Sequence, residues 1–374
     1  MTNKHLTIGN INFFNTTISE QGKKNVLDVL NSGMISAGKK ADEFEVKLSE
    51  YGLINPVTLN SGTVTMHLAL IASGVGPGDE VIIPSQTFIS TGLAVLYVGA
   101  KPIFADINKY DGNISVESIR EKITNKTKAI IPVHWGGYPC DMDGIGKIAE
   151  EYGLSVIEDA AHAFGSKYKN KLIGSISRFT SFSFQAIKHL TTGDGGALCC
   201  LNSEDVVTVK RLRWFDIDRE NSKTGVLGER EYDAVNVGYK YHMNDLSSSL
   251  GLGNLQVIED RLSKIQNIAS YYNEELSNVN GITLMDYKSD RESSYWLYPI
   301  LVENRDAFVK KMKDNNIPVS VVHVGIDKNT VFGGKDMSLL NQRYFDNNQI
   351  HLPINDSLQK EDIKYIIETI KQGW

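Results

Sequence analysis

Short apolar runs alternate with helix-like segments from about residue 20 to residue 241 of this 374-residue chain. Runs such as "VIIP", "KAIIPV" and "LSVIED" are almost continuously Val, Ile and Leu, which is typical of strands that are buried on both faces. Segments between them, such as "DGIGKIAEEYG", have a helical composition and end in glycine. The alternation predicts an α/β fold with a mainly parallel sheet that helices cover on both faces.

After residue 241 the pattern changes. The stretch that begins "MNDLSSSLGLGNLQ" is long and mostly helical, and the strand-like "SYWLYPILV" and the helical "EDIKYIIETIKQ" follow it. We therefore predict a large domain over residues 1–241, including an N-terminal arm. Residues 242–374 form a smaller α+β domain that starts with a long connecting helix. A chain of this length is expected to form more than one domain.

Composition excludes several classes of function. The hydrophobic fraction is 41% and the net charge is −6, which fits an ordinary globular protein and argues against a nucleic-acid partner. The N-terminus lacks the apolar segment of a signal peptide, and no apolar run is long enough to span a membrane. Cys140, Cys199 and Cys200 lack ligand spacing and are expected to be buried, reduced thiols. We expect a cytoplasmic protein with no metal and no membrane partner.

Two strand ends carry residues that could hold a flat, phosphorylated ligand. Ligands of open α/β sheets bind at the carboxyl ends of the strands. Ser61, Gly62 and Thr63 form a small-residue turn before a helix, where backbone N–H groups can bind a phosphate. A capped turn without a ligand explains them equally well. Phe88, after "VIIPSQT", could stack on an aromatic ring or simply pack in the core.

A third strand end places an acidic residue after an apolar run. Asp159 follows "SVIE" and precedes two alanines, so it should be partly buried and should need a cationic partner. A protonated pyridine nitrogen would be such a partner, although an N-cap aspartate has the same pattern. His162 could contact the same ligand or cap the loop.

The stretch "SFSFQAIKHLTTGDGGAL" places Lys188 between a strand and a glycine-rich turn. In an apolar pocket the pKa of a lysine falls, and its free amine becomes nucleophilic toward an aldehyde. Taken alone, the pattern also fits a surface lysine. Ser183, at the end of the same strand, could donate to a phosphate. A phosphate seat, a stacking aromatic, a buried aspartate and a lysine together are what pyridoxal 5′-phosphate (PLP) requires.

The chain resembles the PLP-dependent sugar aminotransferases of the DegT/StrS type, which have the fold type I (aspartate aminotransferase) architecture. The resemblance spans nearly the whole chain and is carried by "LNSGTVTMHLAL", "VIIPSQTF", "PVHWGGYPCDMDGI", "VIEDAAHAFGSKY", "SFSFQAIKHLTTGDGGAL" and "GYKYHMNDLSSSLGLGNL". It implies that Lys188 forms a Schiff base with PLP and later shuttles a proton, with pyridoxamine phosphate as the intermediate form. Asp159 would pair with the pyridine nitrogen, and Phe88 would stack on the ring.

The same resemblance implies the rest of the cofactor site. Ser61, Gly62, Thr63 and Ser183 would hold the phosphate, and His162 would lie near the ring hydroxyl.

It also implies a homodimer in which each subunit completes the neighbouring active site. The family motif Gly-Tyr-Asn-Tyr-Arg reads "GYKYH" here, so Lys240 and His242 replace the asparagine and the arginine. A lysine can contact a phosphate as a point charge, and Lys240 is therefore expected to reach the partner's cofactor.

For the substrates, the resemblance implies an amino acid donor, L-glutamate, and a nucleotide-linked keto-deoxysugar acceptor, in surface-polysaccharide or amino-sugar biosynthesis. A smaller keto or aldehyde sugar without a nucleotide, or a phosphorylated ketone, is the alternative. The segment "VVHVGIDKNTVFGG" offers His323 and Lys328 as acceptor contacts, although a solvated loop explains both residues equally well.

Two further functions are consistent with the fold. In related sugar dehydratases a histidine replaces the lysine, and His189 is adjacent to Lys188; the flanking sequences nevertheless place Lys188 at the attachment position. The second further function is that of a non-catalytic, PLP-binding regulator. About 20 residues precede the first predicted core helix, which would leave no room for a DNA-binding module.

Overall fold

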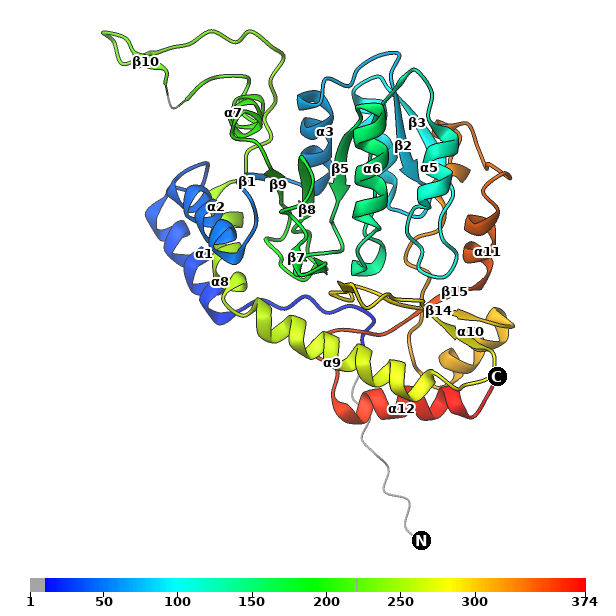
Figure 1. Cartoon of the computed structure of the whole chain (residues 1–374). Helices are drawn as coiled ribbons and strands as arrows, with labels where there is room; N and C mark the ends of the chain where they lie inside the picture. The colour runs from blue at the N-terminus through cyan, green and yellow to red at the C-terminus, as the bar shows by residue number, and fades with distance from the viewer. Residues whose placement is uncertain (1–10, 220) are drawn as a thin grey trace.

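The computed structural model describes residues 11–219 and 221–374, and a seven-stranded sheet forms its centre (Figure 1). The strand order is β1-β9-β8-β5-β4-β2-β3, and only β9 runs against its neighbours. The predicted mainly parallel α/β sheet is therefore confirmed. The strands are β1 (Pro56–Leu59), β2 (Glu80–Pro84), β3 (Lys101–Ala105), β4 (Thr127–Ile130), β5 (Ser155–Asp159), β8 (Phe179–Ser183) and β9 (Gly196–Cys200).

Helices cover both faces of this sheet because its strands bury apolar side chains on both sides. In β2, Ile82 joins one apolar cluster, whereas Val81 and Ile83 join the other. The first cluster includes side chains of α2, α5 and α6, and the second includes side chains of α3, α4 and α7. These helices are α2 (Lys39–Tyr51), α3 (Gly62–Ala72), α4 (Ile89–Tyr97), α5 (Val116–Lys122), α6 (Met142–Tyr152) and α7 (Ser203–Leu212).

The long helical stretch after residue 242 is two helices, not the single connecting helix that we predicted. In α8 (Asp245–Leu255) small residues pack against α1 (Glu20–Ser32) and α2, and Figure 1 shows the three side by side. In contrast, α9 (Ile258–Leu276) buries Ile265, Ile268 and Tyr272 in a separate C-terminal core. One straight helix cannot follow both surfaces, and the chain turns at residues 256–257.

A small antiparallel sheet organises that C-terminal core. Its order is β12 (Ile282–Leu284), β14 (Tyr298–Val302) and β15 (Gln349–Leu352). Side chains of α9, α10 (Arg305–Asp314) and α12 (Lys360–Lys371) pack with it. The domain boundary at 241/242 stays a prediction.

The remaining elements are short. The hairpin of β10 and β11 projects from the body of the molecule in Figure 1. The bounds are β6 (Lys167–Tyr168), β7 (Lys171–Leu172), β10 (Lys223–Thr224), β11 (Arg230–Glu231), β13 (Arg291–Glu292), α11 (Leu340–Asn348) and the 3-10 turns η1 (Trp135–Gly137), η2 (Ile326–Lys328) and η3 (Thr330–Phe332).

All three cysteines are buried and none of them forms a disulfide, as the sequence predicts. None of the helices in the described part of the chain combines the length and the apolarity that a membrane crossing needs.

Candidate active site

A cavity of about 340 Å³ lies where the carboxyl ends of β1, β2, β5 and β8 meet. Parallel strands bring these ends to one edge of the sheet, so residues far apart in the sequence come together there. Most of the sequence-predicted residues line this cavity. They are Ser61, Gly62, Thr63, Phe88, Asp159, His162, Ser183, Lys188 and His323.

Asp159 is the last residue of β5 and is buried. Its Oδ2 accepts a hydrogen bond from Thr91 Oγ1 at 2.8 Å, and its Oδ1 accepts one from Ala161 N at 3.2 Å. Burial raises the pKa of Asp159, while the two hydrogen bonds and the charge of Lys188 act in the opposite direction. This carboxylate would therefore gain from a cationic ligand atom in the cavity.

Lys188 lies in a turn after β8, where its backbone N–H donates to Gln185 O at 2.9 Å. Lys188 is half-buried and lines the cavity. Burial lowers the pKa of Lys188 to about 7, against the opposing charge of Asp159. A large neutral fraction of this amine is thus present near pH 7, and only the neutral amine can attack an aldehyde carbon.

Trp296 is a cavity residue that the sequence analysis missed. The Lys188 Nζ lies 3.5 Å from the centroid of its ring, and the His162 ring stacks on it with a centroid separation of 3.9 Å and an angle of 18°. The sequence "SYWLYP" predicts a strand, but its pattern does not indicate which side chain faces a ligand.

His162 is buried, and its Nδ1 has no hydrogen-bond partner within residues 11–219 and 221–374. Burial, with Lys188 and other histidines nearby, holds the pKa of His162 well below its usual value, so the imidazole is neutral. A ring hydroxyl of a ligand in the cavity would satisfy this buried nitrogen.

The turn between β1 and α3 forms a seat for an anion. Ser61 caps α3, and the first N–H groups of a helix have no partner within the helix. A Cβ added at Gly62 would lie 2.8 Å from Ser183 Cβ, so the helix N-terminus and the end of β8 are in direct contact. Backbone donors beside two serine hydroxyls suit a phosphate.

Phe88 does not pack in the core, which was the alternative interpretation of its position. Its side chain is 53% exposed at the start of α4, and its ring centroid is 5.4 Å from that of His323. The ring is therefore free to stack on a planar ligand.

The lining fits PLP group by group. The turn before α3 suits the phosphate, and Asp159 suits a protonated ring nitrogen. The unpartnered His162 Nδ1 could bond the ring hydroxyl, and the Lys188 amine could react with the aldehyde. The fold and this site define a PLP-dependent enzyme of fold type I.

The sequence pattern of the DegT/DnrJ/EryC1/StrS aminotransferase family matches residues 16–371, and the chain belongs to this family. Three relatives are each 34% identical, over 95–96% of this chain and 94–97% of their own length. They are the spore coat polysaccharide biosynthesis protein SpsC of Bacillus subtilis, the GDP-perosamine synthase of Escherichia coli O157:H7 and the UDP-4-amino-4-deoxy-L-arabinose–oxoglutarate aminotransferase of Shewanella sediminis.

Solved structures agree with the family assignment. AtS13 of Actinomadura melliaura superposes with a TM-score of 0.93 at 32% identity, over 99% of this chain and 100% of that one. The putative sugar aminotransferase Spr1654 of Streptococcus pneumoniae, in its PMP-form, has a TM-score of 0.89 at 32% identity, over 97% and 98% of the two chains. A PLP-form of Spr1654 is similar as well. This chain is a PLP-dependent transaminase of the sugar aminotransferase family.

Lys188 lines the cavity, and its neighbour His189 does not. His189 is buried away from this cavity, and its Nε2 lies 2.9 Å from Ser294 O. Lys188, and not its neighbour, is therefore accessible to a ligand in the cavity that Asp159 also lines, which argues against the dehydratase arrangement.

Two predicted residues do not reach this cavity. Lys328 is exposed at the end of η2. Lys240 is also exposed, and its Nζ lies 3.4 Å from the ring centroid of Trp214. The role of each residue stays a prediction.

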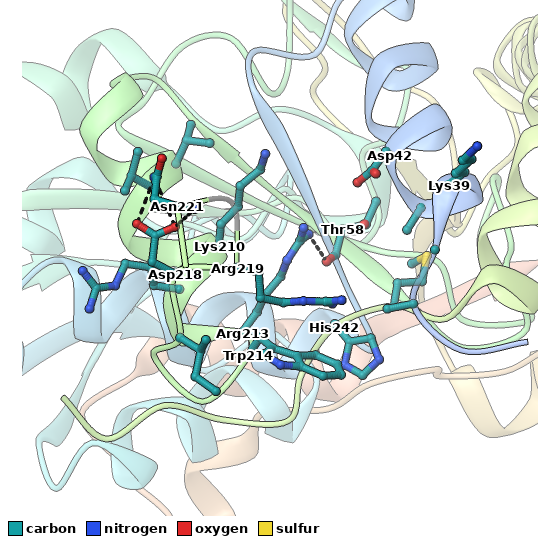
Figure 2. Close-up of a pocket in the computed structure, with 18 of the residues that line it drawn as sticks. Lys39, Asp42, Thr58, Lys210, Arg213, Trp214, Asp218, Arg219, Asn221 and His242 are labelled. Carbon is teal, nitrogen blue, oxygen red and sulfur yellow. Dashed lines mark hydrogen bonds between the residues drawn. The ribbon is translucent and has the colours of Figure 1, made fainter. Parts of the chain in front are cut away.

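Trp214 lies in a second pocket, of about 550 Å³, whose charged lining residues are mainly basic (Figure 2). Arg219 lies over the same indole, with its guanidinium carbon 4.6 Å from the ring centroid. His242 packs edge-on against Trp214, and burial together with Lys240 and two arginines lowers the pKa of His242 to about 4. The basic lining residues are Lys39, Lys210, Arg211, Arg213, Arg219 and Arg230.

Proposed function

We propose that this enzyme transfers the amino group of L-glutamate to a nucleotide-linked keto-deoxysugar that is used in surface-polysaccharide or amino-sugar biosynthesis. The names of the relatives support the acceptor class, and one of those names includes oxoglutarate, the keto acid that glutamate leaves behind. The observation that carries the proposal is a single cavity that holds the Lys188 amine, the Asp159 carboxylate and the anion seat at Gly62.

The residues of the cavity have separate tasks in this reaction. When bound, PLP supplies an electron sink and a carrier for the amino group. Asp159 keeps the ring nitrogen protonated, and Thr91 holds that carboxylate in place. The Lys188 Nζ holds the cofactor between turnovers and carries the proton from the donor's α-carbon during them. Its pKa of about 7 suits both uptake and release of that proton near neutral pH.

We further propose that two copies share their active sites. Among the residues that the structure describes, Lys188 is the only lysine or arginine on the cavity lining. The cofactor phosphate and the two carboxylates of glutamate nevertheless need cationic partners. Lys240 is exposed next to the basic pocket of Figure 2 and is a suitable donor of charge to a neighbouring copy. Lys240 of one copy then contacts the phosphate held by the other.

His323 is the part of the cavity wall that we assign to the acceptor. Burial and the charge of Lys188 lower the pKa of His323 to about 4, so this imidazole is a neutral hydrogen-bonding group at pH 7. Neutral polar and aromatic groups suit a sugar ring better than they suit a carboxylate.

The acceptor can be identified by incubating the purified, PLP-loaded enzyme with L-glutamate and a panel of keto compounds. The panel holds GDP- and UDP-linked 4-keto-6-deoxysugars, the same sugars without a nucleotide, and phosphorylated ketones. Mass spectrometry of the products should find an amine with the nucleotide-linked sugars and none with Lys188→Ala. Amination of only the small ketones would contradict the proposed acceptor while leaving the transaminase assignment intact.

A further inference from the structure

The turn that carries Lys188 is held from outside the large sheet. Three backbone carbonyls around the lysine accept hydrogen bonds from side chains of distant segments: the N-terminal arm, the entry to β14 and helix α9. The pairs are Thr16 Oγ1 to Ala186 O at 3.0 Å, Trp296 Nε1 to Ile187 O at 2.9 Å, and Arg261 Nη1 to His189 O at 2.5 Å.

Arg261 is itself fixed by a buried ion pair. Its Nε donates to Asp356 Oδ2 at 2.9 Å, and both side chains are less than a tenth exposed. Thr17 Oγ1 lies 3.1 and 3.0 Å from the two carboxylate oxygens of Asp356. The planar guanidinium thus contacts Asp356 with one edge while another nitrogen contacts the His189 carbonyl, a geometry that a lysine cannot reproduce.

A buried ion pair adds little net stability, because desolvation of the two charges offsets their attraction. The presence of the Arg261–Asp356 pair beside the lysine turn therefore calls for another reason. One such reason is to hold the catalytic lysine in place, since displacement of a reacting group by about 1 Å can cost on the order of a hundredfold in rate. Arg261 belongs to α9 and hydrogen-bonds the turn directly.

We propose that Arg261, oriented by Asp356 and Thr17, is a positioning residue for Lys188. It fixes the backbone carbonyl of His189, the residue after the lysine, and so the position of the Lys188 amine in the cavity that Asp159 also lines. The proposal rests on the proposed function, in which Lys188 carries the cofactor. It also means that the N-terminal arm and the C-terminal core jointly set the geometry of the catalytic lysine.

The test compares Arg261→Met, Arg261→Lys and Thr17→Val in the PLP-loaded full-length enzyme. Arg178→Met is the matched control, because Arg178 also pairs with an aspartate, Asp205, and donates to a backbone carbonyl, that of Ala72. For each variant we would measure the absorbance of bound PLP against pH, the fraction of PLP fixed to Lys188 by borohydride reduction, kcat and KM for L-glutamate, and Tm.

In Arg261→Met we expect a shifted pH titration of the bound-PLP absorbance, and a kcat lower by about tenfold to a hundredfold with KM within about threefold. Arg261→Lys should recover part of the loss, and Thr17→Val should shift the titration in the same direction by less. Arg178→Met should lower Tm alone.

If Arg261→Met does not fold, Arg261→Lys and Thr17→Val decide the matter. A titration and a kcat equal to those of the wild type in these variants would overturn the proposal and leave the pair a structural one. Absence of borohydride labelling at Lys188 in the wild type would instead overturn the proposed function.

Discussion

Lys188 has a chemical environment that favours the neutral amine. Burial lowers its pKa from 10.5 to about 7, because the negative charge of Asp159 offsets only part of the desolvation of the ammonium. In the unfolded chain the lysine binds its proton more tightly than in the folded protein. Between about pH 7 and pH 10.5, folding therefore releases protons, and stability rises with pH.

This linkage predicts a difference between cofactor-free wild type and Lys188→Met. The free energy of unfolding of the wild type should increase relative to that of the variant as the pH rises from 7 toward 10, because the buried ammonium loses its proton. Urea unfolding of both proteins at several pH values measures it. Parallel pH dependence of the two proteins would show that the amine is not desolvated.

Asp159 is the second residue whose charge matters. Asp159→Asn keeps the shape but removes the negative charge opposite the ring nitrogen, and we expect kcat to fall on the order of a hundredfold to a thousandfold. PLP should still bind through the seat at Gly62 and Ser183. Steady-state kinetics and equilibrium dialysis separate the two effects. A kcat like that of the wild type would remove Asp159 from its proposed role.

At the scale of elements, the turn from β1 into α3 packs directly on the end of β8. A methyl group at Gly62 would lie 2.8 Å from the Cβ of Ser183 and 3.2 Å from its Cα, so the two parts of the phosphate seat would have to separate. Gly62→Ala should therefore weaken PLP binding by about tenfold, roughly the value of one charge-assisted hydrogen bond.

Gly146 in α6 provides the matched control for Gly62→Ala. A Cβ at Gly146 meets nothing within 4 Å, so Gly146→Ala should leave PLP binding unchanged and stabilise the helix by up to about 1 kcal/mol. Titration of both cofactor-free variants with PLP, followed by absorbance, gives the comparison. Equal affinity for PLP in the two variants would contradict the assigned seat.

The sequence predicted those parts of the site that lie at strand ends. A buried strand ends at a definite residue, so Asp159 and the small residues after β1 could be placed from apolar runs alone. Side chains that approach the cavity from the C-terminal core could not be placed from the sequence, because no local pattern encodes packing between distant segments. Trp296 and the break between α8 and α9 are of this kind.

At the scale of the whole molecule, the cavity is short of positive charge, and the proposed dimer supplies it. Lys188→Ala and Lys240→Ala should each be nearly inactive when pure, since one lacks the attachment amine and the other the cation for the partner's site. A mixed dimer places both changes in one site and leaves the other site native.

Mixing the two variants under conditions that exchange subunits should therefore restore up to about a quarter of the wild-type activity, by random pairing with one native site in each mixed dimer. Wild-type enzyme carried through the same exchange is the control. A mixture that remains inactive, although mass spectrometry detects mixed dimers, would contradict shared active sites.

The central claim is that Lys188 carries PLP in an enzyme that accepts the amino group of L-glutamate. Rapid mixing of the PLP-loaded enzyme with L-glutamate, without an acceptor, tests it most directly. We predict loss of the absorbance of the lysine-bound cofactor together with release of one equivalent of 2-oxoglutarate per active site, and neither change in Lys188→Ala. An unchanged spectrum with L-glutamate would contradict this assignment, and an unchanged spectrum with every amino donor would contradict transaminase activity itself.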